Sequence, residues 1–151
     1  DIKPSNVGFS AQGAAKLLDF GQVSAEGAPR GHAPRPSGES GHFMGSERLP
    51  GTAAYMSPEA LAGAPPSAAD DIWALAVLTW ESATGANPFV GITVHGTIAR
   101  VASGRVPAWE TRAEPPIRAL GQVLQRAFSP VASQRWGSAR DFGRAVVQVL
   151  N

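Results

Sequence analysis

Polar residues near the start of the chain have the types that phosphate chemistry requires. Asp1 can act as a general base, and Lys3 can balance the negative charge of a phosphate group. Asn6 and Asp19 offer an amide oxygen and a carboxylate. Such hard oxygen ligands suit Mg²⁺ that is bound jointly with substrate phosphates. Taken alone, Lys3 is better explained as a solvated surface lysine.

A short β-hairpin is expected to position these residues. Pro4 lacks a backbone donor and disfavours a helix at the start of the chain. Residues 7–9 and 15–18 are short apolar runs, and Gly13 between them suits a turn position with positive φ. Two strands joined so tightly should pair antiparallel.

The hairpin brings its two polar ends together. Asn6 precedes the first strand and Asp19 follows the second. Antiparallel pairing returns them to the same end, with backbones about 5 Å apart. Without further support, this pattern is better explained as a plain surface hairpin with polar ends.

Further motifs follow in a fixed order along the chain. They are Gly51-Thr52-Ala53-Ala54-Tyr55-Met56-Ser57-Pro58-Glu59, Asp71-Ile72-Trp73, Thr84-Gly85-Ala86-Asn87-Pro88-Phe89 and Arg135-Trp136. In order and approximate spacing, the chain resembles the C-terminal lobe of eukaryotic-like serine/threonine protein kinases, particularly bacterial ones. Residues 1–6 resemble the catalytic loop from its Asp to its Asn, and Asp19-Phe20-Gly21 resembles the metal-binding triplet. Ser57 stands where the family more often has Ala.

The resemblance implies a role for each candidate site residue. Asp1 would orient the substrate hydroxyl and accept its proton, and Lys3 would offset charge on the γ-phosphoryl group of ATP. Thr52 would bond Asp1 and shape the pocket. Asn6 and Asp19 would hold Mg²⁺ against the ATP phosphates.

The resemblance also implies structural roles. Phe20 would pack into the core, and Asp71 would be a buried carboxylate that accepts backbone N–H groups of the catalytic loop. Glu59 and Arg135 would form a buried ion pair. Ala76 replaces a usual Gly, which should be tolerated.

The chain is expected to divide into three parts of one partial kinase domain. Residues 1–21 hold the catalytic loop, hairpin and metal-binding triplet, residues 22–59 the activation segment, and residues 60–151 a helical subdomain. The Gly- and Pro-rich stretch 22–50 is an activation loop in this interpretation and a flexible linker otherwise. Hydroxyls in or beside it are Ser37, Ser40, Ser46 and Thr52.

Apolar periodicity predicts the helices of the last part. Residues 70–83 are apolar on nearly every face and too short for a membrane span, which indicates a buried central helix with Asp70 as its N-cap. Residues 117–128 and 142–149 show one-sided stripes, and residues 92–103 show a weaker one.

Composition excludes several classes of function. A net charge of +1 provides no strong field for nucleic acid or an anionic membrane. The absence of Cys excludes disulfides and fits a reducing, cytoplasmic compartment, although the parent protein could still be membrane-anchored. The histidines show no metal-ligand spacing; they are His32, His42 and His95.

The expected fold is mainly α with a short β-hairpin, a kinase-like C-terminal lobe whose N-terminal lobe is absent. The expected function is transfer of the ATP γ-phosphoryl group to Ser or Thr hydroxyls of a protein substrate. The chain alone should be inactive, because the glycine-rich loop and strand lysine belong before Asp1. Two alternatives remain: a pseudokinase-type scaffold with a degenerate upstream ATP site, and a fragment with no independent role.

Overall fold

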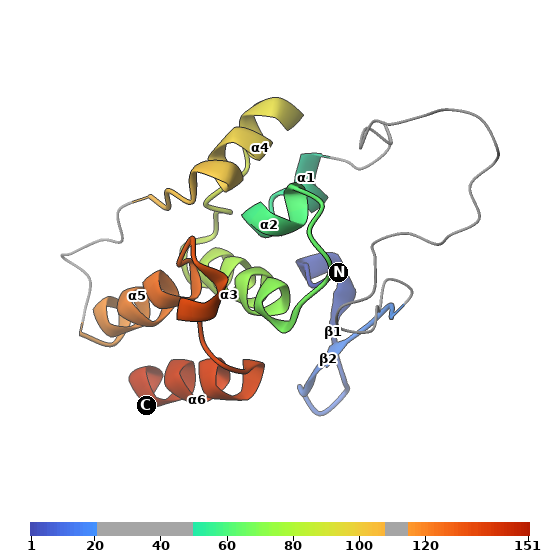
Figure 1. Cartoon of the computed structure of the whole chain (residues 1–151). Helices are drawn as coiled ribbons and strands as arrows, with labels where there is room; N and C mark the ends of the chain where they lie inside the picture. Colours follow the sequence, from blue (N-terminus) through green and yellow to red (C-terminus); the bar gives the residue numbers. More distant parts are fainter. Residues whose placement is uncertain (21–49, 108–114) are drawn as a thin grey trace.

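A computed structural model describes residues 1–20, 50–107 and 115–151 (Figure 1). The predicted activation-loop hydroxyls before residue 50 lie outside the described residues, as do Gly21, His32 and His42. The described elements are η1 (Pro4–Asn6), β1 (Val7–Phe9), β2 (Ala15–Leu17), α1 (Pro50–Ala53), α2 (Pro58–Leu61), α3 (Ala68–Thr84), α4 (Val94–Ser103), α5 (Pro115–Ala127), η2 (Ala132–Gln134) and α6 (Ala139–Leu150).

The predicted hairpin is confirmed. β1 and β2 pair antiparallel, with Gly8 opposite Lys16 at the centre of the register. Gly13 has a φ of 79° in the turn, a positive value that glycine adopts readily because it has no Cβ. The expectation that Pro4 disfavours a helix at the start of the chain is wrong for residues 4–6, which form the short 3-10 helix η1; Pro4 lies in its first turn, where its missing donor has no helical partner to lose.

Helix α3 lies at the centre of the described helices, with α5 and α6 on one side and α1, α2 and α4 on the other (Figure 1). The buried-helix prediction is confirmed for most of its surface, while Leu75 and Leu78 are only half-buried. Ser67, not Asp70, is the N-cap. Asp70 lies one turn into the helix, and its Oδ2 accepts a hydrogen bond of 2.9 Å from the Ser67 backbone N–H. The capping carboxylate therefore acts from inside the helix.

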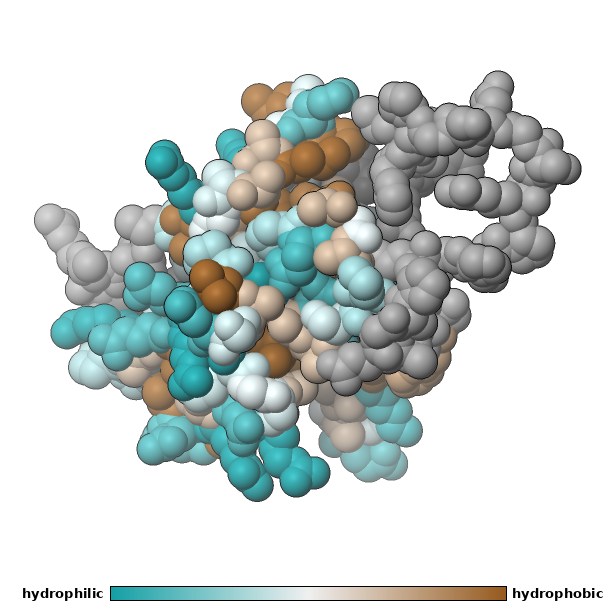
Figure 2. Space-filling model, in the orientation of Figure 1, coloured by the Kyte–Doolittle hydropathy of each residue, from teal (hydrophilic) through white to brown (hydrophobic). Residues whose placement is uncertain are grey.

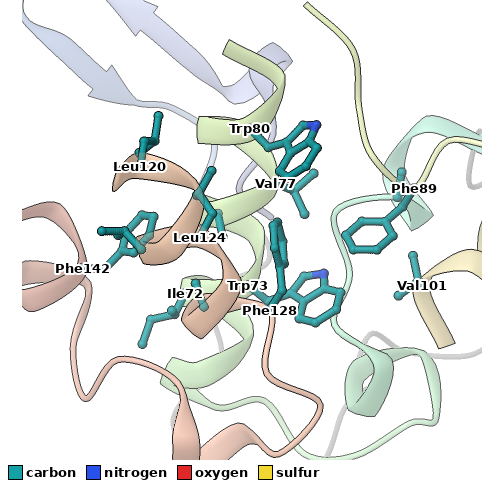
Figure 3. Close-up of a cluster of buried hydrophobic side chains, with 14 residues drawn as sticks. Ile72, Trp73, Val77, Trp80, Phe89, Val101, Leu120, Leu124, Phe128 and Phe142 are labelled. Carbon is teal, nitrogen blue, oxygen red and sulfur yellow. The ribbon is translucent and has the colours of Figure 1, made fainter. Parts of the chain in front are cut away.

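Aromatic rings fill the space between α3 and its neighbours (Figure 3). Trp73 of α3 stacks on Phe89, and Phe128 meets Trp73 edge-on; both pairs of ring centroids are 5.2 Å apart. Phe128 also meets Phe89 and Trp80 edge-on. Such pairs add to the free energy gained by burying the rings. The core therefore joins α3 to segments on both sides of it.

The later helices bury the faces that their stripes predict. In α5, Leu120 and Leu124 are buried, whereas Ile117 at the start of the stripe is exposed. Phe142 is the buried anchor of α6, and Val101 that of α4. Ala76, the replacement for the family's usual Gly, is fully buried in α3. Its extra methyl group is accommodated in the packed core.

The predicted ion pair between Glu59 and Arg135 is confirmed. Arg135 Nη1 and Nη2 donate to the two carboxylate oxygens of Glu59 over 2.6 and 2.9 Å. Arg135 also donates to the backbone carbonyls of Ala69 and Ser129, and its guanidinium carbon lies 5.0 Å from the ring centroid of Trp73. The pair thus ties α2 to the start of α3 and to the segment after α5.

Exposed apolar side chains gather on the hairpin. Phe9, Leu17, Leu18 and Phe20 all stand clear of the core cluster. The expectation that Phe20 packs into the core is wrong, because 65% of this residue is exposed. The core forms around α3, and the hairpin contributes none of its buried side chains. Among the described helices, none is long and apolar enough to cross a bilayer.

Candidate active site

Asp1, Lys3 and Asn6 form one contact group at the start of the chain. Lys3 Nζ lies 2.6 Å from Asp1 Oδ2. Asn6 Nδ2 donates to the same carboxylate oxygen over 3.2 Å and to the Asp1 backbone carbonyl over 2.8 Å. The carboxylate of Asp1 is therefore oriented from one side by a cation and an amide.

The local backbone holds Asn6 rigidly. The turn of η1 brings the Asn6 N–H to the Lys3 carbonyl over 2.9 Å. The Asn6 carbonyl accepts a hydrogen bond of 2.7 Å from Leu18, which extends the hairpin ladder by one residue. Asn6 is 7% exposed, so that its side chain is fixed by burial as well as by hydrogen bonds.

Asp19 lies at the same end of the hairpin, as the sequence predicts. Because Leu18 pairs with Asn6, Asp19 is the next residue beyond the paired end. Its φ of 56° is the only positive value among the described residues other than glycines. A left-handed aspartate is uncommon, and it redirects the chain directly after β2.

Thr52 lies in α1, and none of the hydrogen bonds found among the described residues joins it to Asp1. The predicted bond between them is thus not formed in this structure. The backbone carbonyl of Thr52 accepts a hydrogen bond of 3.2 Å from the backbone N–H of Tyr55. The role of Thr52 in shaping a substrate pocket stays a prediction.

The expectation of a buried Asp71 is wrong, because this residue is exposed at the first turn of α3. Its carboxylate is nevertheless partly desolvated, which raises its pKa.

The oxygen types of Asn6 and Asp19 suit a magnesium ion that is held mainly by phosphates. The amide nitrogen of Asn6 is occupied by Asp1, whereas Oδ1 accepts only a long hydrogen bond of 3.5 Å from Ser5 Oγ and is the atom that a metal would contact. Within the described residues, no group of three or more His, Cys, Asp or Glu could hold a metal ion alone. An amide oxygen and the Asp19 carboxylate are a typical protein share of a Mg²⁺ site.

Two polar contacts made by residues between α1 and α2 were not predicted from the sequence. Tyr55 donates a hydrogen bond from its hydroxyl to Glu81 of α3. Burial is the largest cause, and this hydrogen bond the second, that raises the pKa of Tyr55 to about 12. Ser57, which is fully buried, donates to Asp70 over 2.5 Å and accepts from the Ala60 N–H over 3.0 Å. The sequence did contain a signal for the contact between Ser57 and Asp70, because Ser57 places a hydroxyl where the family more often has Ala.

Comparison with known proteins decides the family. The protein kinase domain family matches residues 1–138. The chain belongs to this family. A Dictyostelium discoideum protein named as a probable serine/threonine-protein kinase is 39% identical over 138 residues, which cover 91% of this chain and 23% of that protein.

Bacterial kinases are also among the relatives of this kinase-family chain. Serine/threonine-protein kinase PknB of Mycobacterium tuberculosis is 29% identical over 153 aligned residues, covering 100% of this chain and 22% of PknB. PknA of Corynebacterium glutamicum is 37% identical over 91 residues, covering 60% of this chain and 17% of PknA. The chain thus spans about a quarter or less of the length of these relatives.

Proposed function

We propose that this chain carries the catalytic-loop half of a serine/threonine protein kinase. The reaction is transfer of the γ-phosphoryl group of ATP to a Ser or Thr hydroxyl of a protein substrate. The observation that carries the proposal is that Asp1 Oδ2 forms an ion pair with Lys3 and accepts a hydrogen bond from Asn6. A carboxylate fixed in this way is pre-oriented for a substrate hydroxyl.

Each residue of the contact group has a distinct task in this proposal. Both partners of the Asp1 carboxylate bind Oδ2, and no described residue donates a hydrogen bond to Oδ1. Oδ1 then accepts the hydrogen bond of the substrate hydroxyl and, late in the reaction, its proton. Lys3, which is 2.6 Å from Asp1, can turn its charge toward the phosphoryl oxygens as negative charge shifts during transfer.

Asn6 and Asp19 would hold Mg²⁺ in the proposed site. The chemistry that such an ion would supply is neutralisation of the charge on the ATP phosphates. The Asn6 amide is already oriented by Asp1, so that little side-chain entropy is lost when Oδ1 binds the ion. The left-handed backbone of Asp19 is the strained feature that such a site commonly contains.

A fusion protein tests the activity. Residues 1–151 are joined behind the preceding part of the kinase domain of PknB from Mycobacterium tuberculosis, which supplies the upstream lobe that the resemblance implies. We expect ATP-dependent phosphorylation of a Ser/Thr protein substrate. Asp1→Asn should lower the rate by about 10²–10⁴-fold, because the oriented base is lost. Lys16→Gln, an exposed charge removal in β2, is the matched control and should leave the rate unchanged.

The same fusion distinguishes the alternatives. Nucleotide binding with no phosphoryl transfer would contradict the enzymatic proposal and favour a pseudokinase-type scaffold. Phosphorylation that persists in the Asp1→Asn variant would show that Asp1 is not the base. The isolated chain is expected to transfer no phosphate, which an assay without the added lobe measures directly.

A further inference from the structure

A basic surface lies away from the candidate site, at the end of α5 and along α6. Arg126, Arg140 and Arg144 are all exposed there. Asp141 is the one acidic residue in the sequence 115–151, whereas the whole chain has 12. In Figure 2 hydrophilic side chains project from the lower part of the molecule, where Figure 1 places α6.

A shallow hollow interrupts this basic surface. It has a volume of about 430 Å³ and is lined by residues that include Arg126, Trp136, Arg144, Ala145 and Gln148. Trp136 and Ala145 are half-buried and give the hollow a partly apolar floor. The two arginines supply positive charge at its edge, Asp141 supplies the one carboxylate of the lining, and the exposed amide of Gln148 supplies a neutral donor.

The floor and one arginine are already held in place. Trp136 Nε1 donates to the Val123 carbonyl over 3.1 Å, which fixes the plane of the indole ring. The guanidinium carbon of Arg126 lies 4.2 Å from the centroid of that ring. Stacking of this kind orients the planar donors of the guanidinium before any ligand arrives. A ligand that pairs with Arg126 therefore immobilises less side chain than it would elsewhere on the surface.

The local acid does not cancel the positive charge. Asp141 Oδ2 accepts a hydrogen bond of 2.7 Å from Ser138 as part of the helix cap. Its other oxygen lies 3.8 Å from Arg144 Nη1, at the outer limit of an ion pair, and both side chains are mostly exposed. Contacts of this kind contribute little free energy and can be exchanged for a better carboxylate partner.

We infer that this hollow is a docking site for an acidic peptide segment of a partner protein, one in which an apolar side chain adjoins the carboxylates. Carboxylates match the planar donor geometry of Arg126 and Arg144, and the apolar side chain covers Trp136. The positive surface is small and the whole chain carries a net charge of only +1, which disfavours a long polyanion such as nucleic acid. The inference does not depend on the proposed kinase activity.

Fluorescence anisotropy with the full 151-residue chain tests the inference. The probe is a short fluorescein-labelled peptide of alternating glutamate and leucine. We expect saturable binding that weakens as salt is raised. Replacing both arginines, by Arg126→Gln with Arg144→Gln, should weaken binding about tenfold, which is roughly threefold for each exposed charge pair removed. Arg126→Lys should restore only part of the loss, because it keeps the charge but not the fork.

Matched controls separate the surface from general charge effects. Lys16→Gln removes one positive charge from the hairpin and should leave peptide binding unchanged. Circular dichroism of each variant establishes that it is folded, as replacement of exposed arginines should allow. A lysine–leucine peptide should not bind. Absence of saturable peptide binding, equal binding by the double variant, or binding to phosphatidylserine vesicles but not to the peptide would each overturn the inference.

Discussion

The contacts of Arg135 allow a quantitative prediction for Arg135→Ala. Its side chain is fully buried, and it donates to both oxygens of Glu59 and to the carbonyls of Ala69 and Ser129. Removal leaves a carboxylate and two carbonyls without their donor in a protein interior. Breaking a buried pair by removing one partner costs about 3–5 kcal/mol of unfolding free energy.

The exposure of Glu59 limits the size of this effect. A quarter of the Glu59 side chain is exposed, so that water can reach the abandoned carboxylate. The hydrogen bonds to charged groups, at about 1.5–3 kcal/mol each, therefore do not simply add. We expect a loss of about 3–5 kcal/mol, and a smaller loss for Glu59→Gln, which keeps an acceptor for the guanidinium.

Urea unfolding followed by tryptophan fluorescence measures both variants, since Trp73 lies directly against Arg135. Arg140→Ala is the matched control, because Arg140 is exposed on α6 and its removal should change stability by less than about 0.5 kcal/mol. A loss below about 1 kcal/mol for Arg135→Ala would refute the reasoning and show that the pair behaves as a surface ion pair.

Three further predictions follow from local geometry. Gly91→Ala should destabilise the chain by about 1–3 kcal/mol in a urea melt, because a Cβ would lie 2.8 Å from the backbone carbon of Gly96. Ser57→Ala should cost about 1–2 kcal/mol in the same melt, since it removes a helix cap and a donor to Asp70. The pKa of Tyr55 is raised from the usual 10.0 to about 12 in the folded state, so the free energy of unfolding should fall as pH rises between these values. Because the chain has a single Tyr, tyrosinate absorbance can follow the ionisation of Tyr55. Tyr55→Phe should remove this part of the pH dependence of stability.

The sequence predicted the four long helices α3 to α6 and the hairpin because their signals are local, whereas the short helices α1, α2, η1 and η2 were not predicted. Gly13 and the two apolar runs specify a hairpin within a dozen or so residues, and the apolar run of α3 specifies a buried helix. The pairing of Glu59 with Arg135 was available only through the family resemblance. No periodicity links residues so far apart in the chain.

The errors have physical causes that local patterns do not contain. Phe20 is apolar, yet its burial depends on whether the core extends to the hairpin, and the core forms around α3 instead. Asp70 and Ser67 are both good cap residues, and the capping geometry alone selects Ser67. The Tyr55–Glu81 bond joins the turn after α1 to α3, and the approach of these two segments depends on the tertiary fold.

The exposed apolar side chains of the hairpin have a consequence for local unfolding. With its aromatic and leucine side chains outside the core, the ribbon that carries Asp1, Asn6 and Asp19 is stabilised mainly by its own ladder and turns. Amide hydrogen exchange should therefore be fast in this ribbon and slow in α3, where the aromatic cluster is anchored. A protein surface that binds the folded ribbon would raise the free energy needed to open the ribbon. Binding of that surface and ordering of the candidate site would then be linked in one equilibrium.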